Sequence, residues 1–364
     1  MKISRRNFLV SLSSMALTAP YLKAEASPLY LNDVGKLDRL GRIDSLCFGS
    51  CNQEDEAQPC WGPINNLNPD LFMWLGDNIY ADTENMDIMW RKYQRQLAIP
   101  GYQRLLRQTP IIGTWDDHDY GANDSGASYR MKEQSRELFF RFMNEPQNSK
   151  RRDRPGIYNS HQIGSKHGKV KIILFDLRYN KMDRKAPNAD ILGEEQWAWF
   201  ENELATSDAD FHLLGSSISV LSSSLATTED WDKFPASYNR LFSLLNKYNP
   251  RGTLFLAGDK HFGCFSSRPS GARGQRYFEM MSSGLTRTVP GFYKPTVRKY
   301  YGAHKSFTEI NFGHIRFDWN RDVPRLICDI RGRAGQLALR RIFEPDDYTG
   351  LLREVPQKGL ELLD

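Results

Sequence analysis

The hydrophobic pattern of this chain alternates short apolar runs with amphipathic segments. Three of the runs, residues 71–75, 172–175 and 254–257, are continuously apolar, which is typical of strands that a sheet buries on both faces. Strands are predicted in nine segments, namely residues 43–50, 70–75, 109–115, 170–177, 211–220, 253–257, 277–282, 307–317 and 324–330.

Helical periodicity separates the predicted strands. Trp197, Phe200 and Leu204 recur at steps of three and four residues, so they form one apolar face of a helix. Similar patterns predict helices over residues 90–97, 103–107, 132–143, 194–204 and 236–248. Strands that alternate with helices, and then end in an alternating antiparallel pair from Phe307 onward, favour a layered α/β fold with mixed sheets. The last segment, roughly residues 340–364, could form a helix over the sheet edges or a cover over the candidate site.

The first 26 residues have the layout of an export signal. Arg5 and Arg6 precede a moderately apolar stretch at residues 11–19, and a small-x-small cleavage pattern ends at Ala26. The layout resembles a twin-arginine (Tat) signal, which export machinery recognises as an address. It predicts a periplasmic or secreted protein, and an N-terminal amphipathic helix is the alternative. No later stretch approaches the ~18 apolar residues of a membrane span, so we expect no stable membrane insertion.

Composition and charge limit the classes of molecule that the protein is expected to bind. The chain has 364 residues, 40% of them hydrophobic, and a formal charge of +5. The first 26 residues carry four basic residues and one acidic residue, so the remainder has a charge of only +2. This balance does not favour a nucleic acid as an obligatory partner. The basic run at residues 150–154 is interpreted as a solvated loop rather than a binding patch.

Five cysteines leave at least one thiol unpaired in a monomer. Cys51 and Cys60 are a possible disulfide pair in an oxidising compartment. Alternatively, a thiolate bound to a metal accounts for the odd number.

Four motifs place possible metal ligands directly after predicted strands. Open α/β sheets form their crevices at the carboxyl ends of strands, so ligands from several strand ends can converge. The motifs are Phe-Gly-Ser-Cys at residues 48–51, Gly-Asp-Asn-Ile-Tyr at 76–80, Trp-Asp-Asp-His-Asp at 115–119 and Gly-Asp-Lys-His at 258–261. The candidate ligands are Cys51, Asp77, Tyr80, Asp117, Asp259 and His261.

The residue types suit a centre with more than one cation. The Asp77 carboxylate has two oxygens and can bridge two ions, whereas the Tyr80 phenol, with a free pKa of about 10, binds only a strong Lewis acid such as ferric iron. Asp259 and His261 are two positions apart, so both point to one side of an extended segment. Imidazole suits transition metals and carboxylate suits harder ions such as calcium. The alternatives are a helix-capping aspartate, a core tyrosine and a loop aspartate beside a satisfied histidine.

Two further residues could act on an anionic group. Asp116, Asp117 and Asp119 would repel one another unless a cation lay nearby, and His118 among them is a candidate proton donor or phosphate contact. The alternative is a solvated acidic turn. Arg178 follows another buried strand and could clamp phosphate oxygens with two parallel hydrogen bonds. A structural ion pair between Arg178 and Asp176 is the alternative.

At these residues the chain resembles the PhoD-like alkaline phosphatases, relatives of the purple acid phosphatases within the calcineurin-like metallophosphoesterases. The similarity runs from about residue 43 to residue 285. Besides the four motifs, it includes Asn-Asp at 123–124, Asp-Leu-Arg at 176–178 and Leu-Gly-Glu-Glu-Gln-Trp at 192–197. The resemblance implies a four-layer α/β/β/α sandwich of two mixed sheets.

The same resemblance implies a domain organisation and a metal content. Residues 43–340 would form the metallophosphatase domain, after a short lead-in at 27–42 and before an extension at 341–364. A ferric ion would be held by Cys51, Asp77, Tyr80 and His261, and Asp77 would bridge to one or two calcium ions that Asp117 and Asp259 contact; other divalent metals could take the calcium sites. Asn78 and Asp119 are assigned to substrate binding together with Arg178, which with His118 is also assigned a catalytic role.

Two departures from the family pattern affect these expectations. Compared members often carry an additional N-terminal β-domain, whereas only the lead-in precedes the catalytic region here, so we expect substrate access to be organised differently. Asp259 stands where purple acid phosphatases have histidine, which favours calcium over zinc or a second iron.

The implied activity is hydrolysis of a phosphate ester by metal-activated hydroxide. The substrate would be a monoester, a diester or both. A phospholipase-type phosphodiesterase is one rival, because pocket shape rather than the metal centre selects the ester. An exported phosphate- or metal-binding protein is the rival that is not an enzyme. No oligomeric state is predicted.

Overall fold

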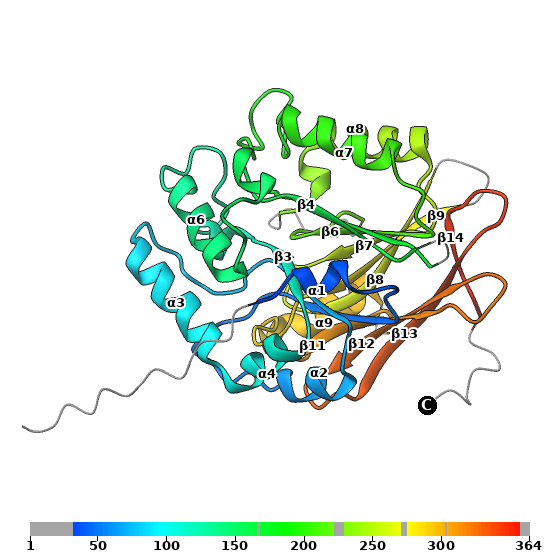
Figure 1. The fold of residues 1–364 in the computed structure, drawn as a ribbon, viewed down its shortest axis with the longest axis horizontal. Coiled ribbons are helices and arrows are strands. Elements are labelled where there is room, and N and C mark those ends of the chain that lie inside the picture. Colours follow the sequence, from blue (N-terminus) through cyan, green and yellow to red (C-terminus); the bar gives the residue numbers. More distant parts are fainter. Residues whose placement is uncertain (1–31, 166–167, 222–228, 271–274, 303, 357–364) are drawn as a thin grey trace, which may run out of the picture.

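The computed structural model describes residues 32–165, 168–221, 229–270, 275–302 and 304–356. The predicted export signal therefore lies outside the described residues. Two seven-stranded sheets, each containing parallel and antiparallel pairs, form the centre of the described chain (Figure 1).

The first sheet combines a parallel part with an antiparallel part. Its parallel strands are β1 (Ser45–Gly49), β2 (Leu71–Leu75) and β3 (Ile111–Thr114). Its antiparallel strands are β11 (Asn311–Asp318), β12 (Arg325–Gly332), β13 (Leu337–Pro345) and β14 (Leu352–Glu354). The strand order is β14-β13-β12-β11-β1-β2-β3.

The second sheet has a parallel centre between antiparallel edges. Its order is β10-β8-β9-β7-β6-β5-β4, and the pairs β5·β6, β6·β7 and β7·β9 are parallel. The strands are β4 (Asn159–Ile163), β5 (Val170–Leu174), β6 (Phe211–Ser216), β7 (Thr253–Ala257), β8 (Gly263–Pro269), β9 (Arg276–Ser282) and β10 (Ser306–Phe307).

Helices cover the outer face of each sheet, as Figure 1 shows for α7 and α8 on one side and α2 and α4 on the other. The α-helices are α1 (Gly35–Asp38), α2 (Trp61–Leu67), α3 (Met86–Ala98), α4 (Pro100–Gln108), α5 (Asp117–Tyr120), α6 (Lys132–Met143), α7 (Glu194–Ala205), α8 (Pro235–Tyr248) and α9 (Lys294–Tyr301). Short 3-10 helices are η1 (Lys150–Asp153), η2 (Trp231–Lys233) and η3 (Gly291–Tyr293).

The order of the layers follows from which side chains pack together. In β2, Leu71 and Met73 join the core between the sheets, whereas Phe72 and Trp74 join a second core with the helices outside the first sheet. β5 behaves likewise, because its alternate residues pack inward or against α7 and α8. Successive strand residues point to opposite faces, so strands with two apolar faces are buried by two layers. The expected α/β/β/α sandwich of two mixed sheets is confirmed.

The strand predictions were accurate where both faces of a strand are apolar. β7 has the predicted bounds, and β1, β2, β3 and β5 lie within the predicted runs. Residues 307–317 divide into β10 and β11, and β11 pairs antiparallel with β12 as expected. β4, β8, β13 and β14 were missed. These strands lie at or near sheet edges, where partly exposed residues lack a continuous apolar signal.

The described part of the final segment extends the first sheet. β13 pairs with β12 and β14 pairs with β13, so neither a helix nor a cover forms over residues 340–356. The boundary predicted at residue 340 falls inside β13. At the other end, the lead-in contains α1, and Asn32 Oδ1 accepts a hydrogen bond of 2.9 Å from the backbone of Ile111 at the edge of β3.

The basic run at residues 150–154 is not a solvated loop as predicted. It forms η1, where the Arg151 guanidinium is buried and donates to Glu145 at 3.0 Å. The Arg152 guanidinium lies over the Phe140 ring at 4.8 Å. Packing against α6 therefore holds this run in place.

Candidate metal centre and cavity

The carboxyl ends of four strands bring the predicted metal ligands together. Cys51 follows β1, Asp77 follows β2, Asp117 begins α5 just after β3, and Asp259 and His261 follow β7. Glycines permit this close meeting of the two sheets. Gly76 has a φ of +93°, and a side chain at Gly258 would approach the Leu75 carbonyl oxygen at 2.5 Å.

Four of these ligand candidates have an unusual backbone conformation. The φ angles are 56° for Cys51, 47° for Asp77, 77° for Asp259 and 62° for His261. Residues other than glycine seldom adopt positive φ, and such strain is found preferentially at functional sites. The turns that present these side chains are therefore strained, as is common at functional sites.

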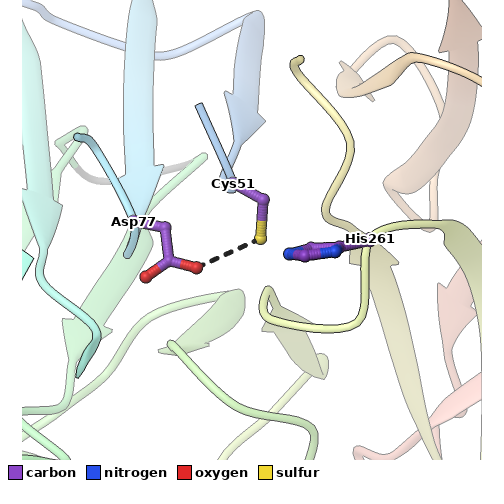
Figure 2. A group of neighbouring side chains, drawn as sticks. All are labelled: Cys51, Asp77 and His261. Carbon is purple, nitrogen blue, oxygen red and sulfur yellow. Dashed lines mark hydrogen bonds between the residues drawn. The ribbon is translucent and has the colours of Figure 1, made fainter. Parts of the chain in front are cut away.

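Several possible ligand groups lie close to one oxygen of Asp77. Figure 2 shows Cys51 and His261 beside this aspartate. The Cys51 thiol lies 3.4 Å from Asp77 Oδ2, and the Tyr80 hydroxyl lies at the same distance from that oxygen. Tyr80 Oη is also 3.0 Å from His261 Nε2. Ligand atoms of Cys51, Asp77 and His261 all lie within 4.8 Å of one another. The structure thus gathers the four residues assigned to the iron site.

A second group shares the same aspartate. Asp77, Asp117 and His118 offer ligand atoms that also lie within 4.8 Å of one another. Asp259 lines the same cavity as Asp77 and Asp117. Asp77 therefore lies between the two groups, which is the position expected of a bridging carboxylate.

Electrostatics at this site favour bound cations. Burial, followed by the charges of Asp117 and Asp116, raises the pKa of Asp77 well above its usual value. Burial, followed by Asp116 and Asp117, also raises the pKa of Asp259. The buried Oδ1 of Asp77 has no hydrogen-bond partner among the described residues. Buried polar atoms are normally paired, so this oxygen has capacity left for a ligand.

The donor set fits the kinds of metal that the resemblance implies. Thiolate, phenolate and imidazole are donors for a transition ion, and carboxylates suit a harder ion such as calcium. The two kinds of donor occur here as neighbours around Asp77. The residues present therefore fit more than one cation.

His118 lines the cavity and makes a hydrogen bond that the sequence did not reveal. Its Nδ1 lies 2.7 Å from Asp82 Oδ1, and its ring lies against that of Tyr80 with centroids 4.3 Å apart. Burial alone would lower the pKa of His118, but Asp82 and Asp117 outweigh it and raise that pKa. Asp82 thus orients the ring and leaves Nε2 as the nitrogen available to the cavity.

Arg178 lies at the site, but its guanidinium is buried against acidic side chains. Its side chain is 1% exposed, and its Nε donates to Asp116 Oδ1 at 2.6 Å while Nη1 contacts Glu229 at 2.5 Å. Arg178 does not belong to the cavity lining, so its contact with phosphate stays a prediction. The alternative ion pair with Asp176 is wrong, because Asp176 Oδ1 accepts from the backbone of Arg178 instead.

Asn78 and Asp119 are likewise buried beneath the cavity rather than exposed in it. The Asn78 amide donates to Asp119 Oδ2 at 2.6 Å and to the Thr114 carbonyl at 3.1 Å. Asp119 Oδ1 also accepts from the backbone of Asp116 at 2.7 Å, which caps α5. Neither residue lines the cavity. The structure supports a positioning role for both, and their assignment to substrate binding stays a prediction.

The possible Cys51–Cys60 disulfide is absent, since all five cysteines are free thiols within the described chain. Cys51 faces Asp77, whereas the Cys60 thiol faces the Leu285 carbonyl at 3.8 Å. Burial, followed by the charge of Asp77, raises the pKa of the Cys51 thiol. A thiol with this environment needs a cation nearby to become a thiolate.

The cavity itself has a volume of about 310 Å³. Its acidic part is formed by Asp77, Asp117, Asp124, Glu229 and Asp259, and residues of η3 and α9 form another part. Sequence reasoning missed α9, Glu229 and Lys260. Lys260 lay inside a recognised motif and could have been noticed, whereas the η3–α9 segment carries no motif.

Comparisons with known proteins agree with this geometry. A family model described as PhoD-like phosphatase matches residues 46–323. Alkaline phosphatase D of Bacillus subtilis (strain 168) is 28% identical over 86 residues, which are 22% of this chain and 15% of that protein. This chain therefore spans only a small part of that relative's length.

Solved structures show the same fold at low identity. The structure of PhoD matches with a TM-score of 0.65 and 16% identity, over 86% of this chain and 72% of that one. A purple acid phosphatase from yellow lupin (Lupinus luteus) seeds matches with a TM-score of 0.59 and 11% identity, over 85% and 55%. A dimetal phosphatase from Danio rerio matches with a TM-score of 0.51 and 14% identity, over 83% and 98%.

The two-sheet fold matches that of the phosphatase structures above, and the strand-tip site offers ligands for more than one cation. Because the family model covers most of its length, the chain belongs to the PhoD-like phosphatase family, a family of phosphoric ester hydrolases. The predicted family and fold are thus confirmed. Within the described residues, no helix is both long enough and apolar enough to cross a membrane.

Proposed function

We propose that this protein hydrolyses phosphate esters at the cavity beside Asp77. The observation that carries the proposal is the position of Asp77, whose Oδ2 contacts Cys51 and Tyr80 while its buried Oδ1 is unpaired among the described residues. Family membership supports the same reaction class.

The proposed metals are ferric iron and one or two calcium ions. Cys51, Asp77, Tyr80 and His261 would hold the iron, and Asp77, Asp117 and Asp259 would hold calcium. Bound there, such ions would polarise the phosphoryl oxygens and lower the pKa of water toward neutrality. Sulfur and phenol occur only in the group with Cys51, Tyr80 and His261, whereas the second group adds the Asp117 carboxylate and His118 to Asp77, which supports this division.

The protein's own groups place the substrate and move a proton. His118, held through Nδ1 by Asp82, presents Nε2 to the ester and can donate a proton to the departing alkoxide. Arg178 positions the acidic side chains of the site, because its guanidinium holds Asp116 at 2.6 Å and lies 3.8 Å from Asp117. The backbone of Asp124 donates to Asp117 Oδ2 at 2.8 Å, which fixes that carboxylate at the cavity.

Turnover of two chromogenic esters tests the reaction. The metal-loaded protein should release p-nitrophenol from p-nitrophenyl phosphate, from its bis ester or from both, and a chelator should abolish the release. The ratio of the two rates separates a monoesterase from a phospholipase-type diesterase. Binding of phosphate without turnover of either ester would instead support a binding protein.

We also propose export through the twin-arginine pathway, on the strength of Arg5, Arg6 and the apolar stretch after them. The test is fractionation of cells that express the full chain and a variant with Arg5→Lys and Arg6→Lys. The expected result is activity outside the cytoplasm for the first and retention for the second. Equal distribution of both would contradict the proposal.

A further inference from the structure

The cavity beside Asp77 has an apolar and aromatic wall in addition to its acidic part. Phe262 and Val289 line it together with residues of η3 and α9. A phosphoryl group belongs at the carboxylates, where bound cations would compensate its charge. The wall therefore faces whatever organic group the phosphate carries.

The wall is one face of a helical segment. Its members recur at steps of three and four residues, the spacing of one helix face. They are Tyr293, Thr296, Val297, Tyr300 and Tyr301. Val297 is 2% exposed, and Tyr301 packs against Phe262 with ring centroids 5.0 Å apart. This packing holds the wall against Phe262, which lies between β7 and β8.

Lys294 and Arg298 of this segment are directed to an acidic side chain outside it, and Lys299 does not line the cavity. Lys294 Nζ lies 2.7 Å from Glu309, and the Arg298 guanidinium lies 3.9 Å from the same carboxylate. Lys260 lines the cavity, but its ammonium lies 2.5 Å from the buried Asp230 carboxylate. These paired charges do not offer a second site for an anion at the wall.

Tyr300 supplies the outer part of the wall. It is 52% exposed and contacts the Tyr301 ring with centroids 5.1 Å apart. A half-exposed tyrosine presents an apolar ring face together with a polar edge, which suits contact with an entering apolar group. Phe292, one residue before Tyr293, is 85% exposed and does not line the cavity.

Resting on the proposed function, we propose that this wall selects phosphate esters whose organic substituent is apolar. The cavity of about 310 Å³ has room for a single ring or a short alkyl chain beside the phosphoryl group. Each methylene that leaves water for the wall adds to the stability of the bound ester. The favoured substrates are therefore apolar alkyl or aryl esters rather than phosphorylated sugars.

A series of alkyl phosphates measures this selectivity. Ethyl and hexyl phosphate have leaving alcohols of similar acidity, so their kcat/KM ratio reports contact of the chain rather than bond strength. We expect hexyl phosphate to be favoured on the order of tenfold by the metal-loaded enzyme. Tyr300→Ser should lower this ratio at least threefold, whereas Phe292→Ser, in the neighbouring exposed position, should not change it. A ratio near one, or equal ratios in the enzyme and Tyr300→Ser, would overturn the proposal.

A binding measurement tests contact between the wall and an apolar substituent independently of hydrolysis. Calorimetry should show tighter binding of hexylphosphonate than of methylphosphonate, and Tyr300→Ser should remove most of that difference. If no phosphate ester is hydrolysed but the phosphonates still differ, the proposed reaction fails and the apolar wall stands. If all esters are hydrolysed equally and the phosphonates bind equally, only the wall is rejected.

Discussion

The Tyr80 hydroxyl lies 3.0 Å from Nε2 of His261, although 181 positions separate the two residues in the chain. Tyr80 follows β2 of the first sheet and His261 follows β7 of the second. The contact therefore joins the strand ends of two sheets. A metal held by both residues would tie the two halves of the sandwich together.

Asp77→Asn should abolish most activity without unfolding the protein. The substitution keeps the shape of the side chain but removes the charge and one of the two oxygens, so we expect kcat/KM to fall at least about 100-fold. The measurement is hydrolysis of p-nitrophenyl phosphate together with the metal content. The exposed Asp183→Asn serves as control. Turnover at the unmodified rate in Asp77→Asn would reject the bridging role.

Tyr80→Phe should remove a visible absorption band. A phenolate bound to ferric iron produces a charge-transfer band, so the purified iron-loaded protein should be coloured and the variant should not be. Tyr102→Phe is a matched control, because that buried phenol accepts from Trp74 Nε1 at 3.0 Å, away from the cluster. An unchanged band in Tyr80→Phe would show that another group colours the protein.

The contact between Asp82 and His118 should affect poor leaving groups most. His118→Gln should lower kcat on phenyl phosphate about 100-fold and Asp82→Asn about tenfold, with smaller losses on p-nitrophenyl phosphate, whose leaving group needs less protonation. If Asp82 acts through His118, the double variant should be no slower than His118→Gln. Equal losses on both esters would contradict proton donation by His118.

Arg178→Met should destabilise the fold. Removing one partner from a buried ion pair leaves an uncompensated charge, here on Asp116, so we expect unfolding to be easier by about 3 kcal/mol. The exposed pair between Arg240 and Glu194, at 2.6 Å, gives the control Arg240→Met, with an expected loss below about 1 kcal/mol. Denaturant unfolding of both metal-loaded variants compares them. Similar losses in the two would show that Arg178 is not structurally important.

His212 should make stability depend on pH below neutrality. It is buried at the start of β6, where Nδ1 bonds to the Arg251 carbonyl at 2.7 Å and Nε2 to Ser207 at 2.8 Å. Burial lowers the pKa of His212 from 6.5 to about 4. The unfolded chain therefore takes up a proton first as the pH falls, and stability is lost between about pH 6.5 and pH 4, by up to about 3 kcal/mol.

Unfolding in urea at pH 7 and pH 5 measures this effect. His212→Gln should show a smaller difference between the two pH values than the unmodified protein, and exposed His304→Gln should show the same difference. An unchanged pH dependence in His212→Gln would mean that other groups cause it.

The local sequence determined the strands that are buried on both faces and the motifs that follow them. β2, β5 and β7 carry continuous apolar runs, because both of their faces are covered, and such runs are visible without knowing what covers them. The ligand candidates at their carboxyl ends were found for the same reason. The resemblance carried by these motifs also indicated the family and the sandwich.

Tertiary structure alone decided which of the polar residues face the cavity. Nothing local distinguishes Asp117, which lines it, from Asp119, which is buried against Asn78 two positions later; the short turn of α5 separates them. The pairing of Arg178 with Asp116 joins residues 62 positions apart, and the η3–α9 wall reaches the site from another part of the chain. Such long-range contacts depend on how the layers pack, and no local period of the sequence encodes that packing.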